Sequence, residues 1–152
     1  MPKTKKSTSP FSYLLDVNVL LALTWPNHQF HGLAHEWFAA HRDLGWATCT
    51  LVELAFVRLS MHPSFTKSPA TASQSFAMLE QIRTLGGHHS AHDSGVTIGS
   101  DPGTTFSKVV GSKQVNDAYL IQLAYQHGAK LATFDRRLKV LAMLESQLEI
   151  IG

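Results

Sequence analysis

The sequence predicts one α/β domain, a three-layer α/β/α arrangement in which helices cover both faces of a mostly parallel central sheet. Two patterns indicate this fold class. Short apolar runs without polar alternation are typical of strands buried on both faces, and they alternate with segments whose apolar residues recur at helical spacing. With 152 residues, 44% of them hydrophobic, the chain can fill one core, whereas two separate domains would each be marginal. We therefore expect a single domain over 11–152, preceded by a basic, flexible tail over 1–10.

In the first half of the chain, short apolar runs predict the strands and apolar stripes predict the helices. The first strand ends at Asp16, and the helix after it is expected to stop before Pro26, because proline cannot continue a helix. Asn27 is a plausible N-cap of the next helix. The expected elements are, in order, a strand over 12–15, helices over 17–23 and 27–41, a strand over 46–49 and a helix over 50–61.

In the second half, Ser68 and Pro69 supply a cap and a first-turn proline for one helix, and Gly128 ends a later helix. The stretch 87–105 is rich in Gly, Ser, His and Asp, and it is either a functional loop or a disordered segment with room for one brief strand. The expected elements are a helix over 68–86, a strand over 88–91, a helix over 114–127, a strand over 131–134, a helix over 137–144 and a strand over 148–151.

The composition favours a soluble cytoplasmic protein. Cys49 is the single cysteine, so no internal disulfide can form and a reducing compartment is expected. The carboxylate of Asp16 interrupts the apolar run near the N-terminus, which argues against a secretory signal or a membrane span. The net charge is +2, but the stretch 108–139 holds six basic residues and only two acids. This stretch is either a solvated surface or the contact face for a polyanionic partner.

Four of the eleven acids need an explanation, because they are embedded in apolar sequence. An ionised carboxylate in such a place is costly unless it is paired, hydrogen-bonded or metal-bound. Three of them follow expected strands, whose carboxyl ends form the edge where open parallel sheets usually carry their chemistry. These candidate catalytic and metal-binding residues are Asp16, Glu53, Asp117 and Asp135.

Each of these acids also has a purely structural interpretation. Thr50 and Glu53 match a capping box, Asp16 and Asp135 are possible N-caps, and Asp117 would favour the first turn of a helix through the helix dipole. The functional interpretation therefore depends on the joint pattern of the four acids.

That joint pattern resembles the PIN-domain family, and within it the VapC-type toxins of bacterial toxin–antitoxin pairs. The resemblance extends from about Tyr13 to Ile151 and is specific in four blocks, which occur in the family's order and spacing. The stretch 86–105 matches nothing in the family pattern. The four blocks are Leu-Leu-Asp-Val-Asn from 14 to 18, Thr-Leu-Val-Glu-Leu from 50 to 54, Gln-Val-Asn-Asp-Ala-Tyr-Leu from 114 to 120 and Leu-Ala-Thr-Phe-Asp-Arg-Arg-Leu from 131 to 138.

The resemblance implies a PIN-like nuclease domain that cleaves RNA, forms a homodimer and is inhibited by a cognate antitoxin protein. The carboxylate oxygens themselves favour Mg²⁺, with Mn²⁺ able to substitute, and such an ion can activate water for phosphodiester hydrolysis without a His or Cys nucleophile. We expect Asp16 and Asp117 to bind the metal directly. Glu53 and Asp135 would act through water or position the attacking water.

Five further residues are candidates for supporting roles. Asn18 and Thr133 are expected to orient the carboxylates, although a helix-start polar residue and a strand hydroxyl are equally good interpretations. The basic residues Lys113, Arg136 and Arg137 flank the acids and are candidates for RNA phosphate contacts.

Other classes of function remain open at this stage. A structure-specific DNA nuclease would use the same acids, and a catalytically silent RNA-binding or partner-binding module would bind without cutting. The nine histidines suggest a zinc hydrolase only weakly, because Ala39 stands where a second histidine of the H-E-x-x-H motif would be. His28 and His31 are left out of the catalytic set, since a role at a helix start explains them as well.

Overall fold

The computed structural model describes residues 9–93 and 95–152, so most of the expected basic tail lies outside the described residues. These residues form five strands and five α-helices, with short 3₁₀ helices in several of the connections. The strands are β1 (Tyr13–Leu15), β2 (Trp46–Thr48), β3 (His88–Ser90), β4 (Lys130–Thr133) and β5 (Leu148–Ile150). The helices are α1 (Val17–Thr24), α2 (His31–His41), α3 (Thr50–Ser60), α4 (Ala72–Arg83) and α5 (Val115–Gln126). The 3₁₀ helices are η1 (Arg42–Leu44), η2 (Thr105–Lys108), η3 (Ser112–Gln114), η4 (Arg136–Val140) and η5 (Glu145–Gln147).

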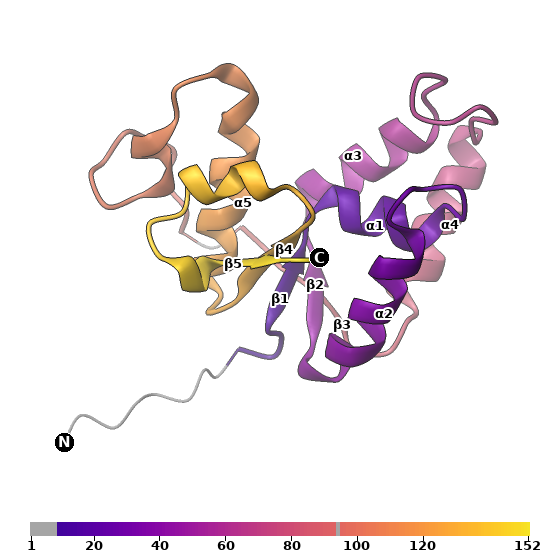
Figure 1. Ribbon diagram of the computed structural model, residues 1–152, viewed down its shortest axis with the longest axis horizontal. Coiled ribbons are helices and arrows are strands. Elements are labelled where there is room, and N and C mark those ends of the chain that lie inside the picture. Colours follow the sequence, from indigo (N-terminus) through magenta and orange to yellow (C-terminus); the bar gives the residue numbers. More distant parts are fainter. Residues whose placement is uncertain (1–8, 94) are drawn as a thin grey trace.

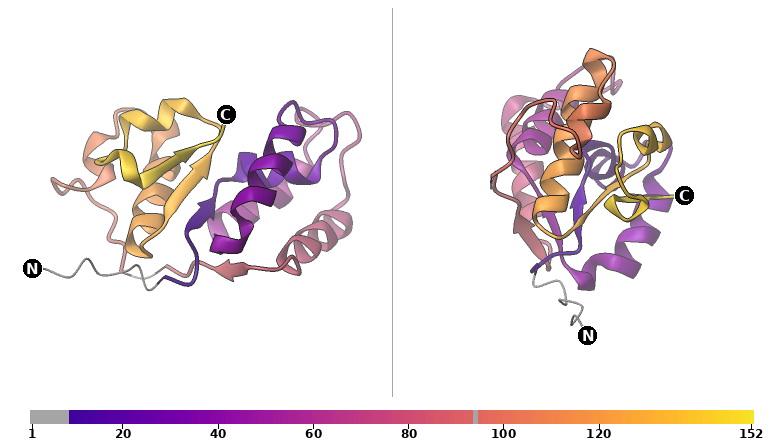
Figure 2. Two further views of the ribbon diagram at one scale, coloured as in Figure 1. Left: turned by 60° about the horizontal axis from the view of Figure 1, so that its bottom comes forward. Right: turned by 90° about the vertical axis from the view of Figure 1, so that its left-hand side faces the viewer.

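All five strands are parallel and lie in the order β3-β2-β1-β4-β5. The chain adds β2 and β3 on one side of β1, and then β4 and β5 on the other. Because parallel crossovers are right-handed, this reversal places the connecting helices on opposite faces. Helices α1 to α4 lie on one side of the sheet and α5 on the other (Figures 1 and 2). The expected α/β/α layers are confirmed, and the carboxyl ends of β1 and β4 meet at the point where the strand order reverses.

The central strands are apolar because both of their faces are covered. Leu14, Leu15 and Leu131 are fully buried, and Trp46 is buried at the start of β2. The Trp46 indole N–H donates to the carbonyl of Gly86 at 3.1 Å, so the one polar atom of this side chain is satisfied. No described helix is long and apolar enough to cross a membrane.

Helices α2 and α4 begin later than the sequence predicted. Helix α4 starts at Ala72 rather than near 68, because Thr71 and Gln74 form a reciprocal capping box. Helix α2 starts at His31 rather than near Asn27. There the His28 side chain accepts a hydrogen bond from the Phe30 N–H at 3.1 Å, which holds the preceding residues in turns.

The short helix expected over 137–144 forms only in its first part, as the 3₁₀ helix η4. The chain forms η4 and then, after a break, η5. The side-chain amide oxygen of Gln147 accepts hydrogen bonds from the N–H groups of Met143 and Leu144, at 2.7 and 3.2 Å. These two donors would otherwise continue a helix, so the glutamine ends it.

Candidate active site

Three of the four predicted acids lie together at the carboxyl edge of the sheet. Asp16 follows β1 and caps α1, accepting a hydrogen bond from the Val17 N–H at 2.7 Å. Asp135 follows the neighbouring strand β4 and caps η4. Asp117 lies in the first turn of α5 and lines, with Asp16, a cleft of about 530 Å³ between α3 and α5. Segments more than a hundred residues apart in the sequence thus supply one group of carboxylates.

The hydroxyl of Thr133 connects this group. It donates to one carboxylate oxygen of Asp16 at 2.8 Å, and it accepts from the Asn18 side-chain amide and from the Asp135 N–H, both at 3.1 Å. The amide oxygen of Asn18 accepts in turn from the Phe134 N–H at 3.3 Å. Thr133 therefore contacts both Asp16 and Asp135, and Asn18 is linked to them through the Thr133 hydroxyl.

The three carboxylates perturb one another electrostatically. Burial raises the pKa of Asp16, and the charge of Asp135 adds to this rise. The hydrogen bonds from Thr133 and Val17 lower the pKa and so offset part of it. Burial and the charges of Asp16 and Asp135 raise the pKa of Asp117 from 3.8 to about 6. Hydrogen bonds from Arg137 instead hold the pKa of Asp135 below its ordinary value. The group is therefore a half-buried site rich in anionic oxygens, whose repulsion a bound cation would relieve.

Glu53, the fourth predicted acid, is on α3 at the wall of the cleft but is not among the residues that line it. Its carboxylate is paired with Arg83 at the end of α4 and accepts a hydrogen bond from Thr48 at 2.9 Å. The alternative capping box with Thr50 does not form, because the N-cap of α3 is Cys49 and no side chain caps this helix. Within residues 9–93 and 95–152, no three His, Cys, Asp or Glu side chains are already gathered closely enough to hold a metal ion.

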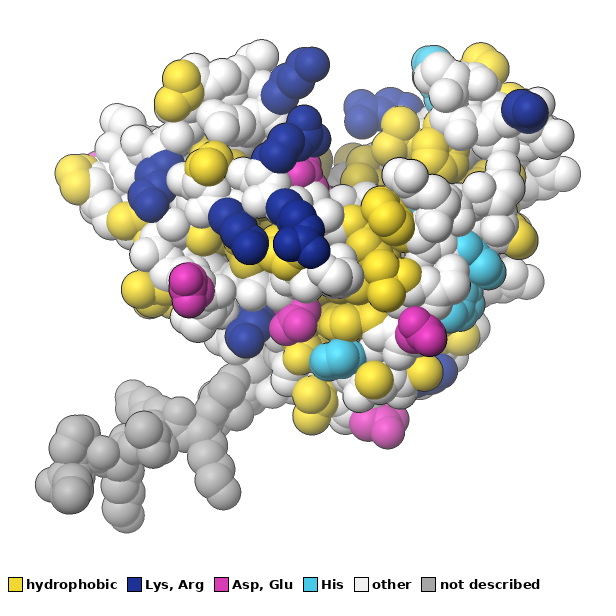
Figure 3. All heavy atoms as spheres, viewed as in Figure 1, with side chains coloured by type: hydrophobic (Ala, Val, Ile, Leu, Met, Phe, Trp, Pro, Cys, Tyr) yellow, Lys and Arg dark blue, Asp and Glu magenta, His cyan; other side chains and the backbone are white. Residues whose placement is uncertain are grey.

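Some basic side chains near the acids face the cleft, and others are bonded within the fold. Lys113 lines the cleft as the sequence suggested, and so does Arg58 of α3. Figure 3 shows basic side chains on both walls of the hollow at the top of the view, with an acidic side chain between them. The Arg137 side chain instead donates two hydrogen bonds of 2.9 Å to the carboxylate of Asp135. The Arg136 guanidinium donates to the carbonyl of Gly152.

His31 and His35, the histidine pair at i, i+4, have structural partners. The rings of His31 and His35 bond to the carbonyls of Ala22 and Leu23 at 2.7 and 2.8 Å, so they satisfy the last turn of α1. This arrangement explains the i, i+4 pair without a metal.

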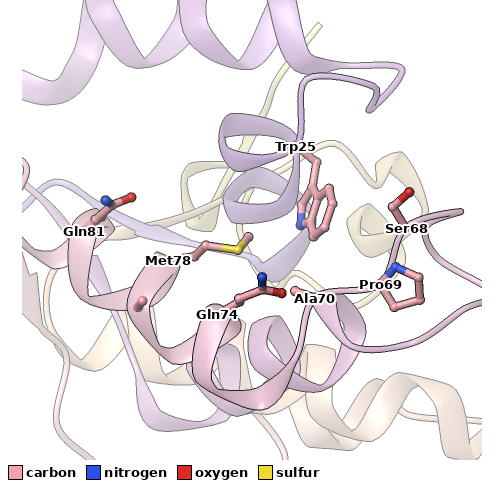
Figure 4. Close-up of a pocket in the computed structure, with 8 residues that line it drawn as sticks. Trp25, Ser68, Pro69, Ala70, Gln74, Met78 and Gln81 are labelled. Carbon is pink, nitrogen blue, oxygen red and sulfur yellow. The ribbon is translucent and has the colours of Figure 1, made fainter.

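A second concavity, of about 580 Å³, lies between α1 and α4 and is slightly larger than the acid cleft. Trp25, Met78, Gln74 and Pro69 form much of its lining (Figure 4). No charged side chain lines it, so it offers no group that could perform acid–base or metal chemistry. We therefore place the candidate active site in the acid cleft.

Sequence reasoning missed Arg58 and Arg83. Arg58 carries a weak signal, because it follows Glu53 by five residues in a predicted helix and so lies near the same end of the sheet. Arg83 carries none, because its partner is 30 residues away in the sequence. Only the packing of α4 against α3 brings the two together.

Comparisons with known proteins agree with this geometry. Residues 13–144 match the family described as PIN domain. Ribonuclease VapC38 of Mycobacterium tuberculosis is 40% identical over 129 residues, which cover 85% of this chain and 89% of that protein. Ribonuclease VapC39 of the same species is 38% identical over 82% of this chain and 89% of its own length. Ribonuclease VapC44 is 34% identical over 86% of this chain and 90% of its own length.

The raised pKa of Asp117 predicts a pH-dependent stability. A group whose pKa is higher in the folded than in the unfolded state contributes stability below the unfolded pKa, and this is lost as the pH rises through the folded pKa. The window here lies between 3.8 and about 6. In EDTA at neutral pH, Asp117→Asn should therefore melt higher than the parent, by roughly two to four degrees for about 1 kcal/mol after solvent screening. At about pH 4 the difference should nearly vanish.

Asp135→Asn is the matched control, because the pKa of Asp135 is lowered by its pairing with Arg137. Removing this charge should lower the melting temperature at neutral pH, where the stabilisation is present, and matter less as the pH falls through the folded pKa. An Asp117→Asn protein that melts lower than the parent at neutral pH would show that these carboxylates do not repel one another.

Proposed function

Because the chain belongs to the PIN domain family, we propose that it is an endoribonuclease that hydrolyses phosphodiester bonds of RNA. The observation that carries this proposal is that Asp16 and Asp117 meet in a cleft whose walls bear Arg58 and Lys113, with Asp135 close enough to raise the pKa of Asp117. Acids at the base suit a cation and basic walls suit a phosphate backbone. The relatives named Ribonuclease VapC support RNA as the substrate.

The donor set fits a hard divalent cation, and we propose Mg²⁺, with Mn²⁺ able to replace it. Carboxylate oxygens are the ligands these ions prefer, and Mg²⁺ commonly takes one or two carboxylates while keeping several waters. Asp16 and Asp117 would bind it directly, and Asp135 and Glu53 would act through water. When bound, such an ion supplies an activated water and neutralises charge on the leaving oxygen.

The protein's own residues prepare the site for this chemistry. Thr133 and Asn18 fix the carboxylate of Asp16, so that little ordering is needed when the substrate arrives. Burial of Asp16 and half-burial of Asp117 strengthen their interactions with a cation. Lys113 and Arg58 would hold phosphates that flank the scissile bond. Arg136 and Arg137 already donate within the fold, so they would add weaker contacts through their remaining N–H donors.

The first test is cleavage by the purified protein. Total cellular RNA should be cut in the presence of Mg²⁺ or Mn²⁺ and remain intact in EDTA, since the metal supplies the activated water. Asp16→Asn and Asp117→Asn should each lose at least about a hundredfold in rate while keeping the circular dichroism spectrum of the parent. Cutting that persists in EDTA would refute the metal mechanism, and cutting of DNA in preference to RNA would assign the same site to a different nuclease class.

The second test measures the contribution of the cleft walls. Each lost phosphate contact should reduce the slope of log binding constant against log salt by roughly 0.7 for single-stranded RNA. We expect this reduction for Arg58→Ala and for Lys113→Ala. Lys130→Ala is the control, because Lys130 opens β4 at the opposite edge of the sheet. Equal slopes for all three variants and the parent would place the RNA path elsewhere.

We further propose that the protein is a cytoplasmic toxin, assembled as a homodimer and held in check by a cognate antitoxin protein. The resemblance to VapC-type toxins implies this proposal, and the relatives named Ribonuclease VapC support the toxin assignment. Overproduction without an antitoxin should arrest the growth of a bacterial host, and Asp117→Asn should relieve the arrest. Normal growth despite abundant active enzyme would indicate an RNA-processing nuclease instead.

A further inference from the structure

The carboxylate of Glu53 is fully engaged outside the acid cleft. Arg83 donates to one carboxylate oxygen from Nη2 at 2.5 Å and to the other from Nε at 3.3 Å. Thr48 donates to the second oxygen at 2.9 Å. The Glu53 side chain is only 15% exposed, against 43% for Arg83. This partly shielded, two-point pair differs from an ordinary surface ion pair, which solvent would weaken.

A chain of hydrogen bonds holds this arrangement on the sheet. The hydroxyl of Thr48, fully buried at the end of β2, has one proton, and it is donated to Glu53. The nitrogen Nε2 of His88, 2.8 Å from the same hydroxyl, must then be the donor in that contact. His88 opens β3, next to β2. Two neighbouring strands and α4 therefore fix where Glu53 points.

Glu53 nevertheless stands at the wall of the acid cleft. Its neighbours in the sequence, Val52 and Leu54, both line the cleft. Rotation of the Glu53 side-chain torsions would be needed to carry the carboxylate toward Asp16 and Asp117. Without a bound cation this movement is unfavourable, because Asp16 and Asp135 already raise the pKa of Asp117, and a fourth carboxylate would add to the repulsion.

We propose that Arg83 is a positioning residue that competes with the divalent cation for Glu53. Its guanidinium is the counter-ion of Glu53 and holds this carboxylate away from the other acids. A divalent cation would compete with Arg83 for Glu53, so Arg83 would set the metal concentration at which Glu53 joins the other acids. This inference rests on the proposed function, since it assumes a cation among the acids.

The test is a double-mutant cycle on Mn²⁺ binding, measured by calorimetry with the full chain and without RNA. Arg83→Met removes the competing charge but keeps an apolar side chain of similar length. It should tighten Mn²⁺ binding by about three- to tenfold, the range expected for a partly shielded ion pair. Glu53→Gln should weaken binding. In the Glu53→Gln background, adding Arg83→Met should change the affinity by less than about twofold, because there is no carboxylate left to release.

Arg58→Met is the control for a general field effect, because it removes one positive charge from the cleft wall without touching Glu53. It should tighten Mn²⁺ binding less than Arg83→Met does. Unchanged or weaker binding by Arg83→Met, or an equal gain in both backgrounds, would overturn the competition. Thermal melts in EDTA show whether each variant is folded. A folded parent that binds no Mn²⁺ at all would instead refute the proposed metal site itself.

Discussion

The buried carboxylate of Asp16 is the constraint on which the rest of the site depends. Asp16 is 5% exposed, and a charge in such a place needs hydrogen bonds from the surrounding fold. The register of the sheet supplies them: Leu15 of β1 pairs with Ala132 of β4, so the next residues, Asp16 and Thr133, lie side by side. The Asp16 N–H also donates to the Ala132 carbonyl at 2.9 Å. Satisfying this one group thus requires β4 to lie beside β1, which brings Asp135 to the same edge.

The structural and functional interpretations of the acids are compatible. Asp16 and Asp135 are N-caps, as the structural interpretation expected, and Asp117 lies in the first turn of a helix. Helix starts point toward the carboxyl edge of a parallel sheet, so capping acids from several connections gather there. The partial positive charge of each helix start also makes such a group of acids less costly while no cation is bound.

Sequence could predict the parts of the molecule that depend on local pattern. Apolar runs located four of the strands, and β3 was expected only as a brief strand in a polar stretch. The acids that follow β1 and β4 could be assigned to one edge because parallel strands share their direction. The direction of Glu53 could not be predicted, since it depends on an arginine of another helix. The end of η4 could not be predicted either. The side chain of Gln147 accepts hydrogen bonds from two backbone N–H groups that a continuous helix would have used.

Some basic residues of this protein bond within the fold and others face the cleft. Counting charges along the sequence does not distinguish these two groups. In the basic stretch 108–139, Arg137 is paired with Asp135 and Arg136 binds the last residue of the chain. Part of the positive charge there is therefore engaged within the fold. Arg58 lies outside the stretch, yet it shares the cleft with Lys113. A guanidinium held in a bidentate pair with a carboxylate loses much of its attraction for a second anion. Such an arginine changes the pKa of its partner acid, whereas a cation that faces the cleft remains available to a phosphate. The electrostatic surface offered to RNA is therefore set by which acids hold which arginines.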